Sequence, residues 1–220
     1  MRANREKWMR PIRIVLADDH TLVLEAFQKL LEPEFEVVAT ATDGRALVAI
    51  AHDLRPEVVV LDVVMPILNG LDAARQVKEI LPSIKLIFVT MNTDLDLAKA
   101  ALRLGAAAYL LKTSAASELS MAIRHAIRGK KHVTPLIKRE LEKDFIDRPP
   151  GIETRQELTI RQREVLQLLA EGRPMKEVAS ILQVSPRTVA FHKYRIMADL
   201  RLKNSAELIQ YAIRHGIISR

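Results

Sequence analysis

Five polar side chains in the first half of the chain stand at the ends of short apolar runs. They are Asp18, Asp19, Asp62, Thr90 and Lys112. Three carboxylates gathered in one place repel one another unless a proton or a cation joins them. A hard divalent ion such as Mg²⁺, held by one or two carboxylates and by water, relieves this repulsion and leaves positions for a phosphoryl oxygen. These residue types therefore indicate phosphoryl chemistry, provided that the fold brings them together.

The apolar runs predict the elements that could do so. Short runs without polar alternation are typical of buried strands in a parallel sheet, and helical spacing follows each of them. The predicted strands are 12–17, 35–40, 58–61, 84–89 and 107–111, and the predicted helices are 22–31, 43–54, 71–81, 94–104 and one that Ser114 or Ser117 caps and that ends near 128. Such alternation predicts a parallel sheet with helices on both faces, whose strands present their carboxyl ends at one edge.

Asp62 is the central residue of this set. It ends the run Glu57–Leu61, and Pro66 and Asn69-Gly70 shape the loop behind it. A lone Asp at such a place is more often a helix N-cap or a solvated loop acid. A reactive role for Asp62 is favoured only because the other four polar residues are expected to lie near it.

Composition sets limits on the class of protein. The chain has 220 residues, 49% of them hydrophobic, which is enough for one large or two small domains. It has no cysteine, which excludes disulfides and thiolate metal sites. No apolar stretch approaches the roughly 20 residues of a membrane span, and the basic N-terminus lacks the apolar region of a signal peptide. We therefore expect a cytoplasmic protein without a membrane partner.

The positive charge is concentrated in the second half. The net charge is +7, and residues 131–220 carry 17 basic against 11 acidic side chains. A basic region of this kind suggests a polyanionic partner, although a solvated charged surface fits the charge alone equally well.

The second half also has strong helix signals. Thr159 is a good N-cap for a first helix, Met175–Leu182 forms a short second helix, and Ser185 followed by Pro186 starts a third that runs to about Leu200. A fourth helix spans about 205–215. A short helix, a tight turn and a longer capped helix make a helix-turn-helix.

The third helix has one inward and one outward face. Val189, Ile196 and Leu200 point toward a core, whereas Phe191 and Tyr194 point outward. Exposed rings fit either a protein-binding patch or contact with a DNA groove, where rings and methyls meet bases while basic and hydroxyl groups meet phosphates. The candidate DNA-contacting residues are Lys176, Ser185, Arg187, Thr188, Ala190, Phe191, Lys193, Tyr194 and Arg195.

The motifs LADDH, LDVVMPILNG, FVTM and YLLK make residues 12–130 resemble the receiver domain of bacterial two-component response regulators. This resemblance implies that Asp62 is the phosphoacceptor and that Asp19 binds Mg²⁺ directly, with Asp18 and the backbone carbonyl of Val64 assisting. It also implies that Thr90 and Lys112 bind the phosphoryl oxygens and that Tyr109 is a switch aromatic, which turns inward when Thr90 moves. His20 is expected only to begin a helix.

Residues 157–217 resemble the LuxR-type helix-turn-helix, so the whole chain is similar to a NarL/FixJ-type response regulator. One departure is Ala190, where the family often has Lys or Glu. The resemblance implies a flavodoxin-like receiver with strand order 2-1-3-4-5 and a small all-α domain. The expected divisions are an N-terminal extension (1–11), the receiver (12–130), a linker (131–153) and the helix-turn-helix domain (154–220).

The implied function is that of a transcription factor and not of a turnover enzyme. A sensor histidine kinase would phosphorylate Asp62 with Mg²⁺, and the phosphorylated chain would dimerise and bind double-stranded DNA. We expect the surface of the fourth helix, fifth strand and fifth helix, or the recognition helix, to be masked in the resting state. Two alternatives are a degenerate receiver that works without phosphate and an adaptor that binds only proteins.

Overall fold

The computed structural model describes residues 10–147 and 158–218. Most of the predicted N-terminal extension therefore lies outside the described residues. The RPPG segment of the predicted linker, 148–151, lies outside them as well.

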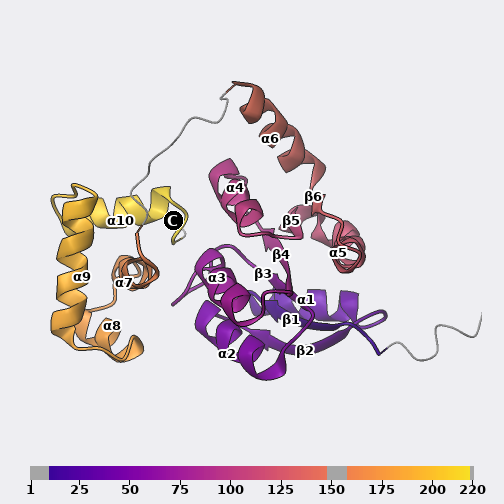
Figure 1. Ribbon diagram of the computed structural model, residues 1–220, viewed down its shortest axis with the longest axis horizontal. Helices are drawn as coiled ribbons and strands as arrows, with labels where there is room; N and C mark the ends of the chain where they lie inside the picture. The colour runs from indigo at the N-terminus through magenta and orange to yellow at the C-terminus, as the bar shows by residue number, and fades with distance from the viewer. Residues whose placement is uncertain (1–9, 148–157, 219–220) are drawn as a thin grey trace, which may run out of the picture.

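The first part of the chain folds around a parallel sheet (Figure 1). Its order is β2-β1-β3-β4-β5-β6 within residues 10–147, so the predicted order 2-1-3-4-5 is confirmed but the predicted number of five strands is wrong. The strands are β1 (Arg13–Ala17), β2 (Glu36–Ala41), β3 (Val58–Leu61), β4 (Lys85–Thr90), β5 (Ala108–Leu111) and β6 (His132–Val133). All neighbouring strands pair in parallel, which places every carboxyl end at the same edge.

Helices cover both faces of this sheet. They are α1 (Thr21–Leu31), α2 (Gly44–Leu54), α3 (Gly70–Ile80), α4 (Leu95–Arg103), α5 (Lys112–Ile127) and α6 (Pro135–Asp147). Buried residues of α2, α3 and α4 share one hydrophobic cluster with the sheet, and those of α1 and α5 share a second cluster on the other face. The sheet is therefore sandwiched, as the unbroken apolar runs predict.

The sixth strand and the sixth helix extend the receiver into the segment predicted to be linker. His132 N donates to Ala107 O at 3.0 Å, and Thr134 N donates to Tyr109 O at 3.0 Å, which pairs β6 with the edge of β5. Ile137 is 1% exposed and belongs to the cluster that contains α4, and Asp144 forms an ion pair with Lys99 of α4. The segment thus covers part of the α4 and β5 surface that we expected to be masked.

The second part is a small bundle of α7 (Ile160–Ala170), α8 (Met175–Ile181), α9 (Pro186–Asp199) and α10 (Ser205–Arg214). Its helix starts follow the sequence signals closely. Thr159 and Gln162 form a reciprocal capping box on α7, and Ser185 accepts from Thr188 N ahead of Pro186 on α9. Val189 and Ile196 are fully buried, so the predicted inward face of α9 is confirmed.

The start of α5 differs from the prediction. The helix begins at Lys112, directly after β5, and neither Ser114 nor Ser117 caps it. The Ser114 hydroxyl instead donates to the carbonyl of Leu111 at 3.2 Å. Strand β5 and helix α5 therefore join without an intervening loop.

Candidate functional site

The sheet edge brings the predicted reactive residues together. Lys112 Nζ lies 2.6 Å from Asp18 Oδ2 and 2.6 Å from Asp62 Oδ2, so a single ammonium group bridges both carboxylates. Asp62 is 6% and Thr90 2% exposed, and the Thr90 hydroxyl oxygen accepts from Asn92 N. The end of β3 supplies Asp62 and the start of α5 supplies Lys112, which is the convergence that a parallel sheet provides.

Burial changes the acidity of this pair. Desolvation raises the pKa of Asp62, and the charge of Asp18 raises it further, while the hydrogen bond and charge of Lys112 offset only part of the rise. Burial alone would lower the pKa of Lys112, but its hydrogen bonds to Asp18 and Asp62 outweigh that cost and leave the pKa raised. The site therefore holds a cation, Lys112, beside a carboxyl group whose anionic form is less favoured than it is in water.

The raised pKa predicts that Asp62→Asn stabilises the fold. The folded state binds a proton at Asp62 more tightly than the unfolded chain does, so the stability from this group is fully present below the unfolded pKa of 3.8 and is lost as pH rises through the folded pKa. The variant should therefore melt at a higher temperature than the wild type at neutral pH without Mg²⁺, and the difference should shrink toward about pH 4. Thermal unfolding at the two pH values measures this, and a less stable variant at neutral pH would contradict it.

Two acids and a histidine form the neighbouring group. Asp18, Asp19 and His20 each place one ligand-type atom within 4.8 Å of the others. His20 Nδ1 lies 3.2 Å from Asp18 Oδ1 and 2.9 Å from Asp19 Oδ1. His20 stands at the start of α1, as its N-cap residue, in line with the expectation, but its contacts with both acids were not expected from the sequence. The Asp19 side chain is 38% exposed, whereas that of Asp18 is 4% exposed.

Tyr109 already points inward. It is 0% exposed, its ring lies 6.3 Å from that of Phe88, and its hydroxyl finds no hydrogen-bond partner among the described residues. Burial is the main cause that raises its pKa. The tyrosine therefore need not turn inward from this arrangement, and its role as a switch stays a prediction.

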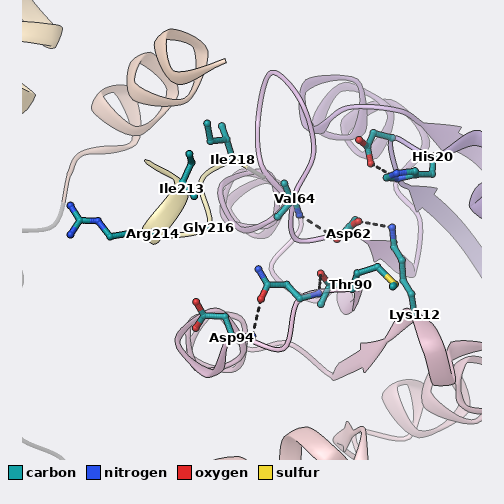
Figure 2. A pocket seen from close by; sticks show the side chains of 13 residues that line it. His20, Asp62, Val64, Thr90, Asp94, Lys112, Ile213, Arg214, Gly216 and Ile218 are labelled. Carbon is teal, nitrogen blue, oxygen red and sulfur yellow. Dashed lines mark hydrogen bonds and ion pairs between the residues drawn. The ribbon is translucent and has the colours of Figure 1, made fainter. Parts of the chain in front are cut away.

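The reactive edge opens into a cavity of about 630 Å³ between the two parts of the chain (Figure 2). Asp62, Thr90 and Lys112 line one side, and Ile213, Gly216 and Ile218, from the C-terminal segment, line the other. Gly216 has φ +60°, and an added Cβ would lie 2.7 Å from both methyl carbons of Leu97 on α4. Only glycine permits this close approach, which holds the C-terminal segment over the site.

A polar interface that was not expected from the sequence joins α7 to the receiver. Arg163 Nε donates to both carboxylate oxygens of Asp72, at 2.8 and 3.1 Å, and Asp72 is 1% exposed. Arg45 Nη2 donates to Glu164 Oε1 at 3.1 Å. Gln167 bonds to the loop that follows Asp62. One signal in the sequence could have indicated this interface. Buried polar residues, Glu164 and Gln167, stand beside buried apolar residues in α7, as in a helix that is covered on two sides.

Most of the candidate DNA-contacting residues belong to α9, and this helix lies on the side of the small domain away from the receiver (Figure 1). Phe191 is 59% and Tyr194 65% exposed, so of the two surfaces that we expected as alternatives for masking, the recognition helix is exposed. The docked surface is α7 instead. Lys176, Ser185, Arg187 and Arg195 are exposed, Thr188 and Ala190 are half-buried, and Lys193 Nζ donates to the Ser205 hydroxyl at 2.9 Å.

Comparison with protein families assigns both halves. Residues 14–124 match the response regulator receiver domain, and residues 156–212 match the bacterial regulatory proteins of the luxR family. The oxygen regulatory protein NreC of Staphylococcus epidermidis is 34% identical over 216 residues, which cover 94% of this chain and 99% of NreC. No helix in the described ranges is long and apolar enough to cross a membrane.

Solved structures agree in fold. RcsB of Salmonella typhimurium is 28% identical with a TM-score of 0.63, covering 94% of this chain and 99% of RcsB. An RcsB–DNA complex is 30% identical with a TM-score of 0.58, covering 92% and 98% of the two chains. The chain therefore belongs to the response regulators, in the branch that joins a receiver domain to a luxR-type helix-turn-helix domain.

Proposed function

We propose that this chain is a DNA-binding transcription factor controlled by phosphorylation of Asp62. The observation that carries this is the pairing of a buried phosphoacceptor-type site with an exposed helix-turn-helix face in one chain. Lys112 and Thr90 lie beside Asp62, while Phe191 and Tyr194 are open to a partner. A sensor histidine kinase is the proposed phosphodonor, and double-stranded DNA is the proposed target.

The donor set suits Mg²⁺. Asp18, Asp19 and Asp62 offer carboxylate oxygens, and the backbone carbonyl of Val64 adds a neutral oxygen in the following loop. Lys112 is a single cation that pairs with both Asp18 and Asp62, so it compensates only part of the charge of the three acids. We assign Asp19 and Asp62 as direct ligands and Asp18 as an assisting group. The bound ion would neutralise negative charge on the phosphoryl oxygens.

The residues then have distinct tasks in phosphoryl transfer. A carboxylate oxygen of Asp62 forms the new bond to phosphorus, while the bond from phosphorus to the donor's leaving group breaks. Lys112 neutralises charge on the equatorial oxygens, and the Thr90 hydroxyl donates to one of them. The modification adds roughly −1.5 to −2 charge if it titrates as other phosphoryl groups do, inside a site that is already short of cations.

The interface at α7 offers a route from this site to DNA. The loop directly after Asp62 contacts α7, so a change at the phosphoacceptor alters the surface on which the second domain docks. We propose that phosphorylation favours release of α7 and formation of a homodimer. Two α9 helices would then enter successive major grooves about 34 Å apart. Solved RcsB structures include one bound to a promoter in the presence of the phosphomimetic BeF₃⁻.

The alternatives fit these observations less well. A degenerate receiver would lack one of the reactive groups, but Asp19, Asp62, Thr90 and Lys112 are all present at one edge. A protein-binding adaptor would not need a basic outer face beside the rings of Phe191 and Tyr194. Aspartyl-phosphate hydrolysis needs a general acid or base near the acceptor, and Val64, two residues beyond Asp62, supplies none.

The test measures DNA affinity and mass with and without a phosphoryl mimic. A duplex DNA ligand is first selected from a randomised library by the BeF₃⁻-treated protein. We expect BeF₃⁻ with Mg²⁺ to convert the protein from monomer to dimer in sedimentation and to tighten DNA binding about 10-fold, within the usual range of allosteric coupling. Asp62→Asn serves as the control that should not respond. If neither mass nor affinity changes, phosphorylation does not control DNA binding in this protein.

A further inference from the structure

The loop that follows Asp62 is held by side chains of the DNA-binding domain. Gln167 of α7 is 0% exposed, and its amide binds the loop at two points. Its Oε1 accepts from Asn69 N at 2.7 Å, and its Nε2 donates to Met65 O at 2.9 Å. Glu171, which caps the end of α7, accepts from Ile67 N at 2.8 Å. Three main-chain groups within five residues are therefore bound across the domain boundary.

The loop has a backbone conformation that needs such support. Ile67 has φ +67°, in the left-handed region that is a genuine outlier for a β-branched residue. Its side chain packs against the hydrophobic cluster of the DNA-binding domain. A strained residue persists only where its surroundings over-determine it. Here the receiver buries the neighbouring Met65 and Leu68, and the DNA-binding domain adds the contacts to Ile67 itself. The docked domain thus selects one conformation of the loop.

This loop also carries the proposed metal ligand. The carbonyl of Val64 belongs to the peptide unit directly before Met65, whose own carbonyl Gln167 holds. Val64 N donates to Asp62 Oδ1 at 3.3 Å, which ties the same segment to the phosphoacceptor. The Val64 and Met65 carbonyls belong to consecutive peptide units. If the Met65 carbonyl turned, the backbone between them would rotate, and the Val64 carbonyl would turn with it.

We propose that Gln167 is a positioning residue for Mg²⁺, because it preorganises the receiver loop from the DNA-binding domain. The docked domain then strengthens Mg²⁺ binding at Asp19, Asp62 and the Val64 carbonyl. This inference rests on the Mg²⁺ role in the proposed function. Because coupling between two equilibria is reciprocal, Mg²⁺ strengthens domain docking by the same factor.

The test is Mg²⁺ titration of the unphosphorylated full-length protein by calorimetry. Gln167→Ala is expected to weaken Mg²⁺ affinity about 10-fold, the lower end of the usual effect of losing a group that orients a metal ligand. Gln167→Glu keeps the acceptor for Asn69 N but cannot donate to Met65 O, so it should also weaken binding while preserving the side-chain volume. Phosphoryl incorporation at saturating Mg²⁺ should reach the wild-type level in both variants, which separates loss of affinity from general damage.

Arg45→Ala is the matched control. The Arg45–Glu164 pair joins the same two domains from α2 and does not touch the loop. Mg²⁺ affinity should fall clearly less in this variant than in Gln167→Ala, because Arg45→Ala weakens docking but leaves the contacts of Gln167 with the loop intact. If Arg45→Ala weakens Mg²⁺ binding as much as Gln167→Ala does, or if Gln167→Ala binds Mg²⁺ as tightly as the wild type or more tightly, the positioning role is wrong. If the wild type itself binds no Mg²⁺, the Mg²⁺ role in the proposed function fails as well.

Discussion

Asp62→Asn is expected to abolish phosphoryl incorporation when the protein is incubated with Mg²⁺ and acetyl phosphate. The Asp62 carboxylate is the buried acid that shares Lys112 with Asp18, and an amide in its place is a far weaker nucleophile. In the wild type, a carboxylate oxygen bonds to phosphorus and acetate leaves. Intact-mass spectrometry should show one added phosphoryl group on the wild type and none on the variant.

Asp53→Asn is the matched control for this change. Asp53 lies on α2, and its side chain is 74% exposed, so the same chemical substitution is made far from Lys112. This control should be labelled as fully as the wild type. Undiminished labelling of Asp62→Asn would show that another group accepts the phosphoryl group.

The double substitution Arg187→Ala with Arg195→Ala should have the largest effect on DNA binding. Both side chains are exposed on α9, and among the described residues the one ion pair of Arg195 is a long contact of 3.8 Å with Asp199. A hydrogen bond to a charged group contributes roughly 1.5–3 kcal/mol, so losing two should lower affinity at least about 100-fold. Affinity measured over a range of salt concentrations should also show a slope that is shallower by about 0.9 for each phosphate that the variant no longer neutralises.

Two comparisons make this result specific. Arg128→Ala, an exposed arginine at the end of α5, should change neither affinity nor slope. Phe191→Ala or Tyr194→Ala should change the preferred sequence more than the slope, because a ring that contacts bases releases no counterion. A salt dependence that is the same in the double variant and the wild type would remove Arg187 and Arg195 from the DNA interface.

Local signals allowed much of the fold to be predicted. Ser185 and Thr159 form the expected helix caps, because these bonds depend on residues three positions apart. The receiver strands were equally accessible, since burial on both faces requires continuous apolar runs. The strand β6 was missed because two residues, His132 and Val133, are too few to form a pattern.

The candidate site was predictable only in part. Asp18, Asp62, Thr90 and Lys112 could be placed together because parallel strands share one edge. The hydrogen bond between Gln167 and Asn69 could not be predicted, because 98 positions separate the two residues and the sequence around either one does not indicate its partner. Which of the two alternative surfaces is covered, that of α9 or that of α4, β5 and α5, could not be predicted for the same reason. Which face of a helical domain docks on another domain depends on long-range complementarity, here between α7 and the loop after Asp62.

The pairing of β6 with β5 protects an edge of the sheet that an isolated receiver domain would expose. A chain that ended at residue 130 would leave the carbonyls of Ala107 and Tyr109 without their amide donors and would make β5 an open edge. All four residues of β5 are buried, so this edge would be an apolar template for another strand. The same truncation would also remove Ile137 from the hydrophobic cluster around α4. The solubility of an isolated receiver therefore depends on residues that follow the family match, which ends at residue 124.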